Sequence, residues 1–308
     1  MRTTRQLSFG DPSVIEIVET DLPEPDFGQV RIAVHAAGVN PVDVHVRAGS
    51  YPLLGEPPFT LGWDVAGVVD AVAPGISAFA VGDRVLGLVG FPAAAGTHAD
   101  YVVADHNQLV AVPESLGIEE AGALPMAGLT AWQAVVGIAG VGPGDTVLVP
   151  RAAGGVGHLA VQIAAARGAR VIAVATAAKH ELLRDLGAAQ VVDYTTEDVA
   201  SAVSGVDVVL DLLGGEHAAT YAGTLRPGGL FVPVMPGNVD EAAAAALGVR
   251  YAGLLVRPSA ADLRSLAELV ALGRLRVLVQ EALPLADVAK AHELVGGGHV
   301  TGKVVLVP

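Results

Sequence analysis

Hydrophobic residues follow two different patterns along this 308-residue chain. Up to residue 120, short runs in which valine, isoleucine and leucine alternate with other residues are interrupted by glycine, proline and aspartate. Alternation with a period of two residues is typical of β-strands that bury one face. The pattern therefore predicts a β-rich first domain, with strands at Val30–Val34, Val65–Val69, Arg84–Val89 and Tyr101–Val103.

Beyond Pro125 the hydrophobic runs become short and continuous, and helical segments separate them. Such runs are typical of parallel strands that helices cover on both faces. They predict a doubly wound α/β sheet with strands at Thr146–Pro150, Arg170–Val174, Gln190–Val192, Val206–Asp211, Gly229–Val234 and Val249–Val256. A helix is expected at Ala286–Val295, and a last strand at Lys303–Val307 that returns to the sheet of the first domain.

A glycine-rich turn, Ala152–Gly157, joins the first of these parallel strands to a helix of small residues from about His158 to Arg167. In such a turn Gly154 lets the backbone approach a pyrophosphate, and Gly157 lets the helix pack closely on its strand. The phosphate then meets free N–H groups and the positive end of the helix dipole. The turn predicts a dinucleotide site, and a purely structural turn is the alternative.

Composition narrows the classes of partner. The net charge is −14 and only three lysines occur, whereas a nucleic-acid partner requires clustered cations, so no nucleic acid is expected. Cysteine is absent, which excludes disulfides, thiolate nucleophiles and cysteine-bound zinc. The first residues lack the apolar core of a signal peptide, and the long uncharged stretch 121–144 contains prolines and polar residues. We therefore expect a cytoplasmic protein with no membrane partner.

The residues after the second parallel strand bear on the choice of dinucleotide. An NAD-selective fold places an acid there, about 20 residues beyond the glycines, to bind the ribose 2′-hydroxyl. This chain has Thr176 and Lys179 instead. A hydroxyl and a cation suit a 2′-phosphate, so the sequence predicts NADPH as the cofactor. The alternative is that Thr176 caps the next helix and Lys179 is a solvated surface residue.

Six ordered sequence blocks match a known family, at Gly38–Asp43, Arg47–Pro52, Gly82–Val85, Leu124–Trp132, Ala152–Gly157 and Gly302–Leu306. Through them the chain resembles, over nearly its whole length, the medium-chain dehydrogenase/reductases, and within these the zinc-independent quinone oxidoreductase branch. The resemblance implies a GroES-like (chaperonin-10-like) substrate domain at residues 1–122 and 276–308, with a Rossmann domain at residues 123–275 inserted into it. It also implies an active site in the cleft between these domains.

The resemblance bears on metal chemistry as well. Zinc-dependent relatives hold the metal with a cysteine and a Gly-His-Glu segment, whereas this chain has Gly62-Trp63-Asp64 there, so zinc catalysis is not expected. The histidines His98 and His106 stand alone, and surface or satisfied core positions are expected for them. Asp43 and His45 have the spacing of a general-base pair, but a structural role in a helical turn is favoured.

The resemblance implies roles for three residues at the reacting group. Asn40 and Thr130 match positions around the nicotinamide or the reducible group, where an amide and a hydroxyl hold a carbonyl oxygen. Tyr51 resembles the tyrosine of enoyl-thioester reductases, and we expect it to donate a proton or to orient the substrate. The alternatives are a turn residue before a proline for Asn40 and an aromatic at the domain rim for Tyr51.

The same resemblance extends the expected cofactor contacts along the chain. Arg151 stands where relatives often carry alanine, and both a phosphate contact and a solvent-facing side chain remain open for it. Tyr194 is expected to contact the adenosine phosphate. The complete expected set is Asn40, Thr130, Arg151, Ala152, Ala153, Gly154, Gly155, Val156, Gly157, Thr176, Lys179, Tyr194, Leu213, Val234 and Lys303.

We therefore expect a zinc-independent oxidoreductase that transfers hydride from NADPH to a quinone or an α,β-unsaturated carbonyl. One alternative is an enoyl reductase acting on an acyl-thioester or a polyketide-type intermediate, for which Tyr51 is the main support. The other alternative is a regulatory or structural protein that binds NADPH without turnover. Because an apolar edge strand needs a cover, we also expect a homodimer that pairs the strands Val249–Val256.

Overall fold

The computed structural model describes residues 1–235 and 237–308. Contacts divide the described chain into two compact units: residues 1–129, 257–272 and 277–308 form the first, and residues 130–256 and 273–276 form the second. Residues 257–272, which the sequence analysis assigned to the Rossmann domain, thus group with the first unit. Packing explains this grouping, because Leu266 Cδ1 lies 3.0 Å from the position that a Cβ would take on Gly128.

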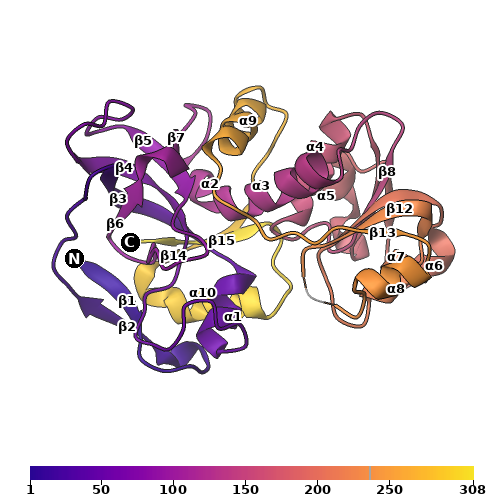
Figure 1. Cartoon of the computed structure of the whole chain (residues 1–308), viewed down its shortest axis with the longest axis horizontal. Helices are drawn as coiled ribbons and strands as arrows, with labels where there is room; N and C mark the ends of the chain where they lie inside the picture. Colours follow the sequence, from indigo (N-terminus) through magenta and orange to yellow (C-terminus); the bar gives the residue numbers. More distant parts are fainter. Residues whose placement is uncertain (236) are drawn as a thin grey trace. The chain divides into compact units, whose positions relative to one another are not determined.

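The strands of the first unit are β1 (Arg2–Gln6), β2 (Ile15–Glu19), β3 (Gln29–Val39), β4 (Asp64–Val72), β5 (Arg84–Leu88), β6 (Tyr101–Asp105), β7 (Leu109–Ala111), β14 (Val279–Pro284) and β15 (Lys303–Val307). The main sheet has the order β14-β15-β3-β4-β5-β7, and β6 also pairs with β3 (Figure 1). Strands β1 and β2 form a separate antiparallel pair.

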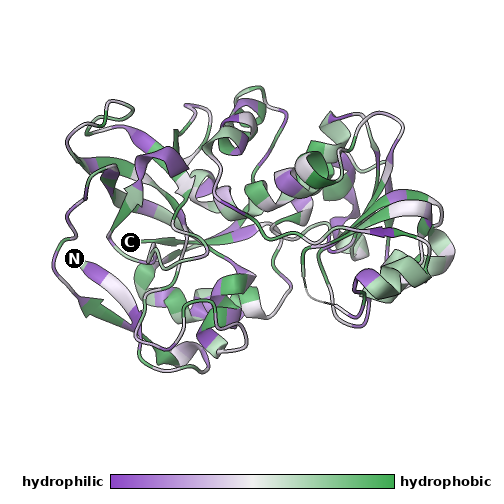
Figure 2. Cartoon of the chain, viewed as in Figure 1, coloured by the Kyte–Doolittle hydropathy of each residue, from purple (hydrophilic) through white to green (hydrophobic). Residues whose placement is uncertain are grey.

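The alternating sequence pattern produces these strands as predicted. The four strands expected in the first 120 residues are observed as β3, β4, β5 and β6, although β5 ends at Leu88, one residue before the expected end. Strand β15 pairs antiparallel with β3, with Val305 opposite Gly38, so the end of the chain returns to this sheet as predicted. Figure 2 shows that β15 is hydrophobic along most of its length, and it is buried up to Leu306.

The helices of the first unit are α1 (Pro41–Ala48), α2 (Ile118–Ala123), α9 (Ala260–Ala271) and α10 (Val288–Gly296), with 3-10 turns η1 (Pro12–Val14), η2 (His106–Gln108) and η5 (Leu285–Asp287). Helix α10 corresponds to the predicted helix near the end of the chain. It buries Val288, Ala291 and His292, whose spacing places them on one face. Helix α3 (Pro125–Trp132) continues into a π-helical segment, η3 (Gln133–Ile138). None of the helices within residues 1–235 and 237–308 has the length and apolar character needed to cross a membrane.

The second unit is a parallel sheet with helical crossovers, as the continuous hydrophobic runs predict. Its elements are β8 (Thr146–Val149), α4 (Gly157–Ala166), β9 (Arg170–Val174), η4 (Ala177–Lys179), α5 (His180–Asp185), β10 (Gln190–Val192), α6 (Val199–Ala202), β11 (Val206–Asp211), α7 (Ala218–Ala222), β12 (Leu225–Pro233), α8 (Glu241–Ala246) and β13 (Arg250–Tyr251). The strand order β10-β9-β8-β11-β12-β13 is that of a Rossmann sheet. It reverses between β8 and β11, and such sheets bind ligands at the carboxyl ends of the strands beside this point.

The prediction of a strand over Val249–Val256 was wrong in extent. Strand β13 covers only Arg250–Tyr251 and pairs with β12, and the Ala252 amide adds one further bond to β12. The neighbouring strand β12 ends at Pro233. Because proline has no amide hydrogen, this residue cannot donate a hydrogen bond to the segment that follows β13.

Candidate functional site

The glycine turn after β8 has the geometry that a dinucleotide requires. The Gly154 amide donates to the Arg151 carbonyl at 3.0 Å, and the His158 Nδ1 donates to the Gly154 carbonyl at 2.9 Å. A Cβ on Gly157 would lie 2.7 Å from the Ala152 carbonyl oxygen, closer than real Cβ atoms come to other atoms. Glycine at this position is therefore what lets α4 start directly against the turn.

The N-terminus of α4 can hold an anion. Its N-cap residue, Val156, forms no side-chain capping hydrogen bond. The first N–H groups of a helix have no partner within the helix, and the helix dipole makes this end positive. Ala152 and Ala153 are buried, whereas Gly155 and Val156 are only half-buried. The turn residues thus fit the pyrophosphate of a dinucleotide.

Three of the predicted cofactor residues lie on the loops that follow β9 and β10. Asp193 accepts a hydrogen bond from the Ala177 amide at 3.0 Å, so these two loops lie side by side and carry Thr176, Lys179 and Tyr194. Thr176 is the N-cap residue of η4, yet its hydroxyl does not form the capping hydrogen bond that was considered as an alternative. Lys179 is half-buried and Tyr194 is exposed. A hydroxyl, a cation and a phenol therefore occupy one edge of the sheet.

Leu213 and Val234 both lie next to Asp211, the last residue of β11. The Leu213 amide donates to Asp211 Oδ1 at 3.1 Å, and the Val234 amide donates to the Asp211 carbonyl at 2.9 Å. Burial raises the pKa of the Asp211 carboxyl, whose Oδ2 has no hydrogen-bond partner within the described part of the chain. The structure thus gathers these two predicted residues at the switch-point edge and adds a buried carboxyl that the sequence analysis did not single out.

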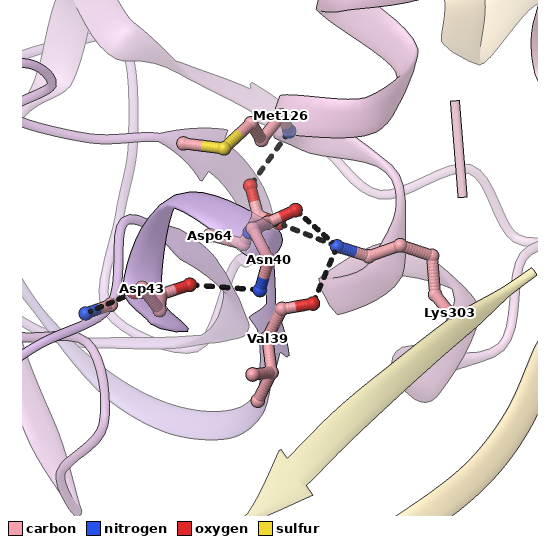
Figure 3. A network of polar contacts seen from close by, with 7 residues as sticks. Val39, Asn40, Asp43, Asp64, Met126 and Lys303 are labelled. Carbon is pink, nitrogen blue, oxygen red and sulfur yellow. Dashed lines mark hydrogen bonds and ion pairs between the residues drawn. The ribbon is translucent and has the colours of Figure 1, made fainter. Parts of the chain in front are cut away.

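A buried polar cluster in the first unit contains two further predicted residues, Asn40 and Lys303 (Figure 3). The Lys303 Nζ donates to Asn40 Oδ1 and, at 3.1 Å, to the Val39 carbonyl. The Asn40 Nδ2 donates to Asp64 Oδ2 at 2.9 Å, and Asp64 Oδ1 accepts from the Met126 amide at 2.7 Å. Strands β3, β4 and β15 and helix α3 therefore meet at this cluster.

The cluster is built around a buried ion pair. Lys303 Nζ and Asp64 Oδ2 are 3.5 Å apart, and their side chains are 4% and 0% exposed. Burial lowers the pKa of Lys303 and raises the pKa of Asp64 to about 6, while the attraction between the two charges opposes both shifts. Both ends of the Asn40 amide are engaged by this pair, so the lysine and the carboxylate fix its orientation. The expected contact of Asn40 with a nicotinamide remains a prediction.

Asp43 is the other carboxyl of this region. It accepts hydrogen bonds from the backbone amide of Asn40 at 2.8 Å and from the backbone amide of Gly62 at 3.0 Å. The bond from Asn40 completes the capping of α1. Burial raises the pKa of Asp43 to about 7 despite these bonds. His45 contacts the Ser50 hydroxyl at 3.1 Å instead. The structural role favoured for Asp43 is thus observed, and Asn40 also takes the turn position before a proline.

The other two predicted catalytic residues differ in accessibility. Tyr51 lies in the loop after α1, in the first unit, and is 42% exposed. Thr130 lies on α3, in the part assigned to the second unit, and is 6% exposed. Tyr51 can therefore meet a ligand from solution, whereas Thr130 is held within packed structure.

A buried pair of histidines, His98 and His292, was not signalled by the sequence. Their rings are nearly perpendicular, with centroids 6.0 Å apart, and both side chains are fully buried. Burial lowers the pKa of His98 to about 4 and also lowers that of His292. The ring nitrogens of His292 have no hydrogen-bond partner within the described part of the chain, whereas a backbone hydrogen bond at Gly38 raises the pKa of His98 against the effect of burial. His98 thus takes the core position, one of the two that were expected for it.

Comparison with known proteins identifies the family. Residues 26–114 match the alcohol dehydrogenase GroES-like domain, and residues 186–306 match a family described as zinc-binding dehydrogenase. The quinone oxidoreductase of Homo sapiens is 31% identical over 327 residues, which cover 100% of this chain and 98% of that protein. The chain is a member of the quinone oxidoreductase branch of the medium-chain dehydrogenase/reductases. The predicted GroES-like and Rossmann folds are thereby confirmed.

Two further relatives and two solved structures are also similar to this chain. A 2-haloacrylate reductase of Burkholderia sp. is 34% identical over 97% of this chain and 96% of that protein. The polyketide synthase GfsB of Streptomyces halstedii is 39% identical over 87% of this chain, but the chain spans only 4% of that protein. The solved quinone oxidoreductase from Coxiella burnetii has a TM-score of 0.92 and 35% identity, covering 100% of this chain and 99% of that one. The Escherichia coli quinone oxidoreductase, solved in complex with NADPH, has a TM-score of 0.91 and 26% identity over the full length of both chains.

The residues at the zinc position of the wider family do not fit a zinc ion. Trp63 stands there with its indole fully buried, donating to the Ala93 carbonyl at 2.7 Å, and an indole offers no lone pair to a metal. Asp64 is already paired with the Lys303 ammonium. Across residues 1–235 and 237–308, no group of three or more histidine, aspartate or glutamate side chains is arranged to hold a metal. The one signal in the sequence that pointed to Asp64 was its place in the segment that corresponds to the metal-binding segment of zinc-dependent relatives.

Proposed function

We propose that this quinone oxidoreductase branch member uses NADPH to reduce a quinone or an α,β-unsaturated carbonyl compound. The observation that carries the choice of cofactor is the edge formed by the loops after β9 and β10. Thr176 and Lys179 follow β9, where an NAD-selective fold carries an acid. The NADPH found in the Escherichia coli relative supports the same choice.

The second unit supplies the cofactor contacts in this proposal. The turn from Arg151 to Gly157 binds the pyrophosphate at the start of α4. Lys179 and Tyr194 contact the phosphate on the adenosine ribose, and a cation favours that charged group. Leu213 and Val234 line the carboxyl edge at the switch point, where the nicotinamide half of a dinucleotide is bound.

The first unit supplies the residues that orient the reacting groups. NADPH, when bound, provides the hydride, so the protein must position an electron-poor acceptor and stabilise the oxygen that gains charge. The Lys303–Asp64 pair fixes the Asn40 amide in one orientation, which prepares it to position a polar group of the cofactor or the substrate. We assign Thr130 the same kind of contact through its hydroxyl.

Tyr51 is the proton donor in this proposal. A phenol carries a proton that it can donate to an enolate carbon or a hydroquinone oxygen. Its exposure of 42% leaves it open to substrate. Tyr51→Phe is expected to lower kcat for an enone by about 10- to 100-fold while KM for NADPH changes little. An unchanged kcat would remove Tyr51 from the reaction and leave solvent as the proton source.

A second candidate function is reduction of an enoyl thioester. The similarity to the polyketide synthase GfsB favours it, because the matched region spans most of this chain. The two candidates are separated by comparing kcat/KM for a simple quinone with that for a short enoyl thioester. NADPH binding without turnover on any quinone or enone would instead favour a regulatory or structural protein.

The Lys179→Glu variant tests the proposed cofactor. We expect the Kd for NADPH to rise by about 10- to 100-fold, because a charge-assisted contact is replaced by repulsion, and the Kd for NADH to change by less than about 3-fold. Lys290→Glu is the matched control, since Lys290 lies on an exposed helix surface in the first unit and pairs with Glu281. Equal weakening of both cofactors would remove Lys179 from the 2′-phosphate site.

We also propose a cytoplasmic homodimer that pairs the segments after β13. Leu255 in this segment is 63% exposed, and β13 leaves hydrogen-bonding groups at the edge of the sheet. Light scattering at micromolar concentration is expected to give twice the chain mass. Leu255→Lys should shift the mass toward the monomer, and a monomeric wild-type protein would contradict the proposal.

A further inference from the structure

Arg151, the first residue of the glycine turn, has an unusual backbone conformation. Its φ is 54°, in the left-handed region, and it is the one non-glycine residue with a positive φ among residues 1–235 and 237–308. A side chain with a Cβ is disfavoured in this region, and such strain persists where the surrounding structure imposes it, often at ligand-binding positions. The sequence left open whether this arginine faces solvent or a phosphate.

The left-handed conformation determines where the backbone carbonyl and the side chain of Arg151 lie. Its carbonyl turns inward and accepts the Gly154 amide at 3.0 Å, which closes the turn. Its side chain folds over the same glycine, with Cγ 3.5 Å and Nε 3.7 Å from the position that a Cβ on Gly154 would take. The arginine therefore covers the glycine whose missing side chain gives a pyrophosphate access to the backbone.

The surroundings favour a bound anion beside this side chain. Arg151 is half-buried, and burial lowers the pKa of its guanidinium, but an arginine remains charged at any working pH. The start of α4 adds its positive dipole end, and the N-cap residue Val156 provides no capping acceptor. A guanidinium and the positive end of a helix thus lie at one turn in a protein whose net charge is −14.

We propose that Arg151 is a strained clamp for the pyrophosphate of the dinucleotide. Its planar guanidinium is suited to bind two phosphate oxygens at once, and the contact offsets the cost of the left-handed backbone. This inference rests on the proposed NADPH-dependent function and adds a second cation to it. Because NADH and NADPH share the pyrophosphate, Arg151 strengthens binding of both, whereas Lys179 distinguishes them.

Three variants separate the charge of Arg151 from its strain. Arg151→Ala removes the guanidinium and keeps a Cβ in the left-handed region, Arg151→Gly removes both, and Arg151→Lys keeps a single charge. Binding is measured by calorimetry with NADPH, NADH, ADP-ribose and adenosine 2′-monophosphate, and the stability of the ligand-free protein by thermal unfolding. Adenosine 2′-monophosphate lacks the pyrophosphate and is the matched control ligand.

We expect Arg151→Ala and Arg151→Gly to weaken NADPH, NADH and ADP-ribose alike by about 10- to 100-fold, with Arg151→Lys between them and the wild type. Adenosine 2′-monophosphate should bind all variants equally. Arg151→Gly should unfold at a higher temperature than Arg151→Ala, because only glycine relieves the strain. Unchanged binding of ADP-ribose, or equal loss of adenosine 2′-monophosphate, would overturn the clamp. Failure of the wild-type protein to bind any of these nucleotides would overturn the proposed function instead.

Discussion

Replacing the buried His98 is expected to change how the stability of this protein depends on pH. Burial lowers the pKa of His98 from 6.5 to about 4 in the folded protein, whereas the unfolded chain keeps the ordinary value. Between these two values the unfolded state binds a proton that the folded state does not. The free energy of unfolding therefore decreases as the pH falls from 6.5 toward 4.

The size of the effect follows from the two pKa values. For a single group that titrates at 6.5 when unfolded and at about 4 when folded, the loss of stability between pH 7 and pH 5 is about 2 kcal/mol. The charged neighbours of His98 act in opposite directions, since Asp64 raises its pKa and Lys303 lowers it. Asp43 and Asp64 titrate in the same range with the opposite effect on stability, so the prediction concerns the difference between two proteins, in which their contributions cancel.

The measurement compares wild type with His98→Gln, which keeps a polar side chain but cannot titrate. Urea unfolding at pH 7 and pH 5 gives the free energy of unfolding of each protein. The variant is expected to lose about 2 kcal/mol less than wild type over this interval. His299→Gln, which removes an exposed histidine, is the control and should behave as wild type. If both variants lose the same stability as wild type, His98 is not held neutral by burial and the reasoning is refuted.

Two further substitutions test the packing of the turn and the buried ion pair. Gly157→Val should abolish binding of NADPH and NADH alike, because its Cβ would lie 2.7 Å from the Ala152 carbonyl oxygen, and retained binding in calorimetry would contradict the close contact of helix and turn. Lys303→Met should cost about 3–5 kcal/mol in urea unfolding, because it leaves the Asp64 carboxylate buried without its cation. Lys290→Met, which breaks the exposed ion pair with Glu281, should lower the free energy of unfolding by less than about 1 kcal/mol. Equal losses for the two variants would show that the buried pair stabilises the protein no more than the exposed one.

The fold could be predicted where hydrophobic periodicity decides it. Strands β3 and β11 differ in pattern because β3 is antiparallel to its neighbours, whereas β11 lies inside a parallel sheet that helices cover. The short β13 could not be predicted from its own residues, because its end depends on Pro233 in the neighbouring strand. The grouping of α9 with the first unit likewise depends on contacts with α3, which sequence order does not reveal.

Local motifs revealed the cofactor half of the candidate site more fully than the buried cluster. The turn at Gly154 could be recognised in the sequence, because the pyrophosphate site proposed for it requires residues without side chains. The cluster of Asn40, Asp64 and Lys303 joins residues far apart in the sequence, and only the pairing of β15 with β3 and of β3 with β4 brings them together. His98 and His292 meet through the same kind of long-range packing, so no spacing rule could have paired them.

The positions of the lysines and of Arg151 can be understood from the negative net charge of the protein. Of the three lysines in a chain with net charge −14, one lies at the edge proposed for the 2′-phosphate, one is buried against Asp64 and one pairs on the surface with Glu281. An acidic protein repels a phosphorylated cofactor at long range, but that field is screened over about 10 Å at moderate salt, whereas direct contacts are screened much less. In the proposed complex, the dinucleotide is therefore held by cations within hydrogen-bonding distance. Arg151 is proposed to bind the pyrophosphate that NADH and NADPH share, and Lys179 the 2′-phosphate that distinguishes them.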